Sequence, residues 1–204
     1  MFVVVEGLDG AGGKTLTDAL DNHYRKQGVP CHLMRYPEYD SPWGKIIQSY
    51  LDGRLDIDPK PLFVTYAADQ LKDQKAIRRW KTLGGIILCD RYVTSAIAYE
   101  TALGLSYMEA LKITDAFDFV FPDMILYLDI TTGTSYKRKK KEKGESIDIH
   151  ESNIGLLQKV RRNYQRMIED KLFCHWHQIN ADHPIEKVFE IALGMIETQM
   201  DKRV

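Results

Sequence analysis

The chain has 204 residues, a formal net charge of −1 and a composition that is 44% hydrophobic and 28% charged. This length fits a single α/β domain over residues 1–204, and the near-neutral charge argues against nucleic acid as a partner. No apolar run is long enough for a membrane span and no leader pattern precedes one, so we expect a cytoplasmic protein without a membrane partner. Three cysteines, an odd and sparse set, favour a reducing compartment.

The first element is an apolar strand at 2–5, followed by the glycine-rich segment GLDGAGGKT at 7–15. A strand, a glycine-rich turn and a helix in this order are typical of a P-loop, whose backbone N–H groups hold phosphates. We expect the helix to start near Lys14, whose ammonium would reach the β- and γ-phosphates of ATP, and the Thr15 hydroxyl to bind Mg²⁺. The residues expected at the nucleotide are Gly10, Ala11, Gly12, Gly13, Lys14, Thr15 and Leu16.

The spacing of this segment is irregular. Five residues separate Gly7 from the Gly13-Lys14 pair, whereas a P-loop has four. An ordinary glycine turn between a strand and a helix would also explain the segment. We expect the surplus residue to be absorbed at Gly12-Gly13, where a positive φ costs least.

Four more β-rich runs, at 31–35, 86–89, 124–129 and 175–179, alternate with helical segments. This alternation predicts a three-layer P-loop NTPase fold of the α/β class, with a five-stranded, mainly parallel sheet flanked by helices. The sequence further predicts a long helix from Pro59 to about Lys81, a helix that starts with a capping box at 106–109, and a last helix at 184–200.

The strand at 86–89 is followed directly by Asp90 and Arg91. Ligands of open α/β sheets bind outside the carboxyl ends of the strands, so both residues should lie at the same edge as the P-loop. Asp90 could bind Mg²⁺ and Arg91 could bind phosphate oxygens. A solvated Asp-Arg pair that merely ends a strand is the alternative.

The basic run KRKKKEK at 137–143 is the one compositional anomaly. Such a run is usually a solvated helix face. In a phosphoryl-transfer enzyme, a basic lid over residues 137–150 would instead exclude water and neutralise charge on the transferred group.

The segment CHWH at 174–177 cannot easily converge on a metal because adjacent strand residues face opposite ways, so Mg²⁺ is the only metal we predict.

The P-loop-like segment and the 86–92 segment together resemble thymidylate kinase, the family that transfers the γ-phosphoryl group of ATP to thymidine monophosphate (dTMP). The similarity extends over most of the chain, through RYP at 35–37, YAADQ at 66–70, DRYVTSAIAY at 90–99, the basic run, LLQKVRRNY at 156–164 and INADHPIEKV at 179–188. The resemblance implies a kinase of nucleoside monophosphates that uses ATP and Mg²⁺ and forms a homodimer.

The resemblance also implies roles for single residues. Asp9 would bind the 3′-hydroxyl of the acceptor sugar, and Arg91 would bridge the donor and acceptor phosphates. Arg35 and Pro37 would lie beside the acceptor. The candidate catalytic residues are therefore Asp9, Lys14, Asp90 and Arg91.

Four further contacts are implied by position. Tyr66 would stack on the thymine ring, although an aromatic residue on a helix is as often part of a core. Ser95 and Tyr99 would contact the nucleoside, and Arg138 would lie against the adenine of ATP.

The sequence also departs from the family pattern. Gln70 stands where the family usually has an arginine that contacts the base, and residues 148–151, DIHE, lack the arginine usual in the lid. A kinase for another nucleotide or nucleoside, and a nucleotide-binding paralogue without catalysis, therefore remain as alternatives. Counting from the strand places Asp9 at the acceptor-binding position, whereas counting back from Lys14 places Gly10 there; we expect the strand-side count to hold.

Overall fold

The computed structural model describes residues 1–144 and 148–202. Its centre is a five-stranded sheet of strands β1 (Phe2–Gly7), β2 (Cys31–Arg35), β3 (Ile86–Asp90), β4 (Met124–Asp129) and β5 (Trp176–Asn180). The strand order is β2-β3-β1-β4-β5, and every neighbouring pair is parallel. The predicted strands are confirmed, with β5 shifted by one residue.

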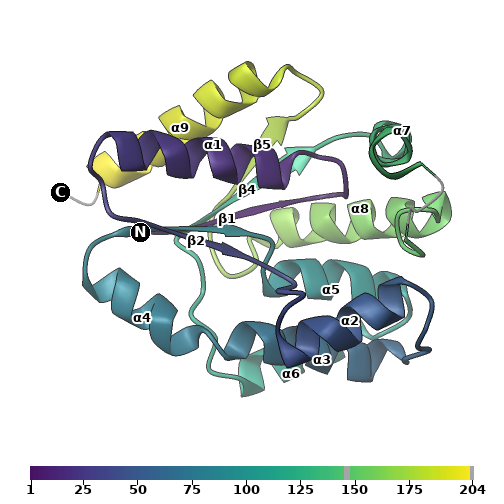
Figure 1. Cartoon of the computed structure of the whole chain (residues 1–204). Helices are drawn as coiled ribbons and strands as arrows, with labels where there is room; N and C mark the ends of the chain where they lie inside the picture. The colour runs from purple at the N-terminus through teal and green to yellow at the C-terminus, as the bar shows by residue number, and fades with distance from the viewer. Residues whose placement is uncertain (145–147, 203–204) are drawn as a thin grey trace.

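The helices are α1 (Gly13–Lys26), α2 (Pro42–Leu51), α3 (Pro59–Leu71), α4 (Gln74–Thr82), α5 (Val93–Ala102), α6 (Tyr107–Ala116), α7 (Thr132–Lys143), α8 (Ile154–Glu169) and α9 (Ile185–Asp201). Figure 1 shows α1 and α9 on one face of the sheet and α4, α5 and α8 on the other. Helix α3 packs on α5, and α2 packs on α3. The predicted three-layer α/β fold is therefore confirmed.

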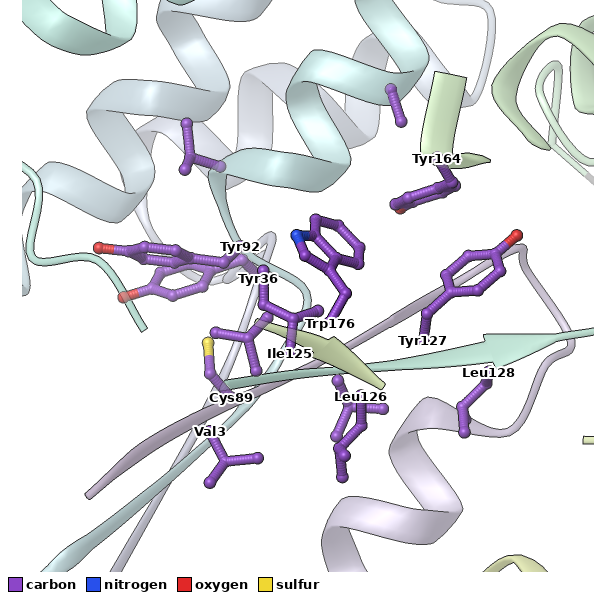
Figure 2. Close-up of a cluster of buried hydrophobic side chains, with 14 of the residues drawn as sticks. Val3, Tyr36, Cys89, Tyr92, Ile125, Leu126, Tyr127, Leu128, Tyr164 and Trp176 are labelled. Atoms are coloured by element: carbon purple, nitrogen blue, oxygen red, sulfur yellow. The ribbon is translucent and has the colours of Figure 1, made fainter. Parts of the chain in front are cut away.

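The central strands are buried on both faces, which explains their consecutive apolar residues. Figure 2 shows Tyr127 and Leu128 of β4 pointing to opposite faces of the sheet. On one face, the rings of Tyr127 and Tyr164 lie 5.1 Å apart between centroids, and Tyr164 contacts Trp176 of β5. The largest buried cluster spans both faces and thereby fixes the edge where the strand ends gather.

The predicted single helix over 59–81 is wrong, because it is broken between α3 and α4 at Lys72 and Asp73. The Asp73 carboxylate accepts a hydrogen bond from the Tyr36 hydroxyl at 2.8 Å. The Gln74 side-chain amide donates to the Gln70 carbonyl at 2.9 Å, which satisfies a carbonyl at the end of α3. These hydrogen bonds replace the backbone hydrogen bonds that would have continued the helix from α3 into α4.

The predicted helix start near Ser106 is confirmed, but the capping box is not formed. Ser106 is the N-cap of α6 without a side-chain hydrogen bond. The Glu109 carboxylate instead pairs with Lys60 of α3 at 2.6 Å. An ion pair between two helices has replaced the local hydrogen bond of the capping box.

No helix among the described residues is long and apolar enough to cross a membrane.

Candidate active site

The glycine-rich segment forms a loop between β1 and α1 at the carboxyl edge of the sheet. Gly10 and Gly12 have φ of 76° and 99°, and Gly12 is the N-cap of α1. Gly12 thus adopts the expected positive φ, whereas Gly13 is the first residue of the helix and not part of the turn. Backbone groups at a helix start attract anions, so this loop has the form of a phosphate site.

Lys14 lines the pocket above the loop, but its ammonium is directed along α1. Its ammonium is 2.9 Å from Asp18 Oδ2 one turn along α1, and its side chain is 74% exposed. Arg35 at the end of β2 binds the other oxygen of the same carboxylate. Arg35 therefore lies beside the start of α1 and does not line the pocket that holds Pro37.

Asp90 and Thr15 line the pocket above the loop, as expected for ligands of a hard cation. A Cβ added to Gly13 would lie 2.5 Å from Asp90 Oδ1, so the carboxylate rests directly on the helix start. Burial raises the pKa of Asp90 to about 6, against the opposing effect of Arg91 and Arg35. The carboxylate is consequently ionised at neutral pH, as a cation ligand must be.

Asp9, Arg91 and Tyr99 form one connected group. The Arg91 guanidinium donates to Asp9 Oδ1 at 2.7 Å and the Tyr99 hydroxyl donates to Asp9 Oδ2 at 2.7 Å. Burial raises the pKa of Asp9, but Arg91 and Tyr99 hold it below its ordinary value. The carboxylate of Asp9 is thus fixed in position by Arg91 and Tyr99 at the edge of the loop.

Arg91 itself has a φ of 68°, which is uncommon for a residue other than glycine. The buried Glu6 carboxylate holds the next turn in place, since it accepts bonds from the Tyr92 N–H at 3.0 Å and the Thr94 hydroxyl at 2.6 Å. Its other oxygen accepts bonds from the hydroxyls of Ser95 and Tyr164. Glu6 therefore joins β1, α5 and α8 beneath the site.

A second pocket opens beside Asp9, and its wall includes the other predicted acceptor residues. These are Pro37, Tyr66, Gln70, Ser95 and Tyr99. Gln70 is buried, and its carbonyl oxygen has no hydrogen-bond partner among the described residues. The Ser95 hydroxyl accepts a bond from Arg91 at 3.1 Å. The chain thus brings these predicted residues together.

The basic run lies on α7, which packs against the loop. The Ser135 hydroxyl donates to the Asp9 carbonyl at 2.7 Å, and Arg138 donates to the Gly10 carbonyl at 3.1 Å and to the Ala181 carbonyl at 3.0 Å. Arg138 thus stands between the loop and the segment after β5. The helix is more than a solvated face, because one side of it is attached to the loop.

The segment after α7 contributes carboxylates and a histidine. Lys139 and Lys143 both pair with Glu151, which is only 3% exposed, at 3.1 and 2.9 Å. His150 stacks on Tyr99 with 5.5 Å between ring centroids, and burial lowers its pKa to about 4. Residues 145–147 of the predicted lid lie outside the described residues.

The two pockets adjoin each other. Three residues line both of them, namely Asp9, Arg91 and Lys139. One pocket contains the glycine loop and suits a polyphosphate; the other contains aromatic rings and an unpaired amide and suits a nucleoside. The two pockets meet at the charged side chains of Asp9, Arg91 and Lys139.

A family model described as thymidylate kinase matches residues 5–191. The chain belongs to the thymidylate kinase family. A probable thymidylate kinase from Thermococcus onnurineus is 32% identical to it over the whole of both chains. A thymidylate kinase from Geobacillus is 30% identical over 99% of this chain and 98% of its own, and one from Dictyostelium discoideum is 25% identical over 99% and 87%.

Membership in the thymidylate kinase family confirms the resemblance and the expected class of enzyme, a phosphotransferase of nucleoside monophosphates.

Sequence reasoning missed Glu6, Tyr164 and His150. Glu6 is part of EGLDG and directly precedes the loop, but nothing in its sequence position shows that four donors converge on it. Tyr164 and His150 enter the site through helix packing and a loop, which leave no local pattern.

Proposed function

We propose that the protein transfers the γ-phosphoryl group of ATP to dTMP, giving ADP and dTDP. An oxygen of the acceptor phosphate forms a bond to the γ-phosphorus while the bond from that phosphorus to the β,γ-bridging oxygen breaks, and the leaving oxygen takes the electron pair. The observation that carries the proposal is the pair of adjoining pockets with Asp9, Arg91 and Lys139 in common. Such transfer depends mainly on positioning and electrostatic stabilisation.

In the donor pocket, the backbone of residues 10–16 would hold the phosphates of ATP, and Lys14 would add positive charge at their edge. Arg138 would lie against the adenine, since it stands between the loop and the segment after β5. Thr15 and Asp90 offer the hard oxygen donors that Mg²⁺ prefers. When bound there, Mg²⁺ would neutralise charge on the phosphate oxygens.

Arg91 would contact both phosphates, and its position in the lining of both pockets supports this role. Its guanidinium is already oriented by Asp9 Oδ1 at 2.7 Å and Ser95 Oγ at 3.1 Å. A planar fork held in this way can bind oxygens of donor and acceptor with little reorganisation. Asp9 would then accept a bond from the 3′-hydroxyl of the sugar, next to Tyr99.

Gln70 supports a pyrimidine acceptor. Its buried, unpaired carbonyl oxygen requires a donor from the ligand. The N3–H of thymine is such a donor, and the Gln70 amide nitrogen would donate to O4 of the same base while Tyr66 stacks on the ring. Pro37 would border the acceptor from the segment after β2.

A coupled assay of ADP release tests the function. We expect dTMP to give the highest kcat/KM among the nucleoside monophosphates. Gln70→Ala should lower kcat/KM for dTMP by about 10-fold to 100-fold, since one buried partner is worth about 1–3 kcal/mol. Gln158→Ala, at an exposed glutamine of α8, is the matched control.

Two outcomes would contradict this proposal. The absence of turnover with every monophosphate, in folded protein, would favour a paralogue that binds ATP and dTMP without transfer, which calorimetry would reveal. A higher kcat/KM for another acceptor would favour a different specificity. The observation in favour of the latter is Gln70 itself, because an inverted amide can also pair with the N3 and amino group of cytosine.

We also propose the organisation predicted from the sequence. The chain forms a single domain in which residues 137–150 act as a lid, and the enzyme works in the cytoplasm as a homodimer. Val64 of α3 and Met108 of α6 are exposed apolar side chains on helices that contact each other, and we propose that they lie in the dimer interface. Sedimentation equilibrium should give twice the chain mass of 23.6 kDa; the mass of one chain would refute the dimer.

A further inference from the structure

The start of α1 carries no lysine at the position where a P-loop has one. Four residues separate Gly7 from the N-cap Gly12, which is the P-loop spacing. The lysine of the motif follows that glycine directly, but here Gly13 follows it. The loop is therefore of ordinary length, and the surplus residue is the first residue of the helix.

The position of Gly13 has no room for a side chain while Asp90 keeps its place, because an added Cβ would lie 2.5 Å from Asp90 Oδ1. Lys14 is displaced by one residue, which is about 100° around the helix axis. Its ammonium binds Asp18 and its side chain is 74% exposed. Lys14 still lines the loop pocket, but its ammonium is bound to Asp18, and the position of the motif lysine itself carries no cation.

Lys139 of α7 supplies a cation next to the glycine loop. A Cβ added to Gly10 would lie 3.3 Å from Lys139 Cγ, so the aliphatic part of this lysine packs on the loop itself. The side chain is only 12% exposed, and it lines both the loop pocket and the acceptor pocket. Its ammonium is therefore held at the border between the two ligands.

Two carboxylates hold the Lys139 ammonium, Glu142 at 2.9 Å and Glu151 at 3.1 Å. Burial lowers the pKa of Lys139, but these carboxylates raise it above its ordinary value, so the cation persists. The Glu142 side chain is 62% exposed and can leave the lysine at little cost. Glu151 remains as the anchor when a phosphate takes the place of Glu142.

We propose that Lys139 makes the direct ammonium contact with the transferred phosphoryl group that the lysine of a P-loop ordinarily makes. The inference rests on the proposed function, and it assigns Lys14 a lesser part. The charge that develops on the phosphoryl oxygens would then be neutralised by Lys139 from one side and by Arg91 from the other.

The test compares single alanine variants of four lysines. Lys139→Ala should lower kcat for dTMP phosphorylation by about 100-fold to 1,000-fold, the usual loss for one transition-state donor. Lys14→Ala should lower it by less than about fivefold, since its exposed pair with Asp18 is worth little. Lys143→Ala removes the other partner of Glu151 and should cost far less than Lys139→Ala. Lys159→Ala, at an exposed lysine of α8 outside the lid and both pockets, should match the wild type.

A binding measurement separates this inference from the proposed function. Calorimetry gives the ratio of affinities for a non-hydrolysable ATP analogue and for ADP, which reports the contact with the γ-phosphate without turnover. Lys139→Ala should abolish the preference of the wild type for the analogue.

If the wild type gives no turnover but still prefers the ATP analogue to ADP, the proposed function is refuted. The role of Lys139 is then decided by the binding measurements alone. The inference is overturned if Lys14→Ala costs as much kcat as Lys139→Ala. It is overturned equally if Lys139→Ala keeps the wild-type ratio of affinities, or if Lys143→Ala reproduces its whole effect.

Discussion

At the scale of single residues, Glu6 shows how one buried carboxylate holds the surrounding elements of a site in position. It is 1% exposed and accepts bonds from Tyr92, Thr94, Ser95 and Tyr164. An ionised carboxylate accepts only, whereas a glutamine amide would present N–H groups to some of these donors. The turn that carries Arg91 is thereby fixed from below.

We expect Glu6→Gln to lower the free energy of unfolding by about 1–3 kcal/mol, since it leaves buried donors without an acceptor. It should also lower kcat through the displaced Arg91. Urea denaturation and the ADP-release assay measure both. Glu190→Gln, at an exposed glutamate of α9, should change neither. An unchanged stability of the Glu6 variant would show that the hydroxyls find other acceptors.

Glu100 of α5 has the opposite character. Its side chain is fully buried, and neither carboxylate oxygen has a partner among the described residues. Burial raises the pKa of Glu100 well above its ordinary value of 4.5. The folded state therefore binds a proton more tightly than the unfolded state does, and this group's contribution to stability is lost as the pH rises above about 4.5.

Glu100→Gln removes this titration while keeping the shape of the side chain. The variant should be more stable than the wild type at pH 8, and the difference in Tm should shrink toward pH 5. Thermal unfolding followed at several pH values measures it. A difference in Tm that is the same at pH 5 and pH 8 would mean that Glu100 does not titrate in this range.

At the scale of elements, the break between α3 and α4 is tied to the acceptor pocket. Asp69 of α3 is fully buried and accepts bonds from the Glu38 N–H at 2.8 Å and the Ser41 hydroxyl at 2.6 Å. Lys72 at the break pairs with Asp69, Asp73 and Glu38. The end of α3 thereby holds the segment 36–41, which forms one wall of the pocket.

Asp69→Ala should raise KM for dTMP by about tenfold, because the loss of one buried acceptor costs about 1–3 kcal/mol and loosens the pocket wall. KM for ATP should change far less, since none of the residues that line the loop pocket in the described part of the chain lies on α3. Steady-state kinetics with each substrate varied in turn measure the two effects. Asp115→Asn on the exposed side of α6 is the control. Equal increases in both KM values would indicate general destabilisation.

At the scale of the whole molecule, the sheet was predictable because its strands are short apolar runs that need no partner to be recognised. The convergence of Asp9, Asp90 and Arg91 was predictable as well, since parallel strands bring their carboxyl ends to one edge. The break of the 59–81 helix was not, because it depends on a bond between Tyr36 and Asp73 from different parts of the chain. The place of Lys14 depends on which glycine starts α1, and spacing alone leaves that undecided.

The wall common to both pockets has a consequence for inhibitor design. Among the described residues, Asp9, Arg91 and Lys139 line both sites. A molecule that joins thymidine to adenosine through a polyphosphate chain would fill both at once, and the second half would bind at a high effective concentration. Its affinity should exceed that of either nucleotide alone by about 10²-fold to 10⁴-fold. Competition against both ATP and dTMP would identify such a dual-site inhibitor.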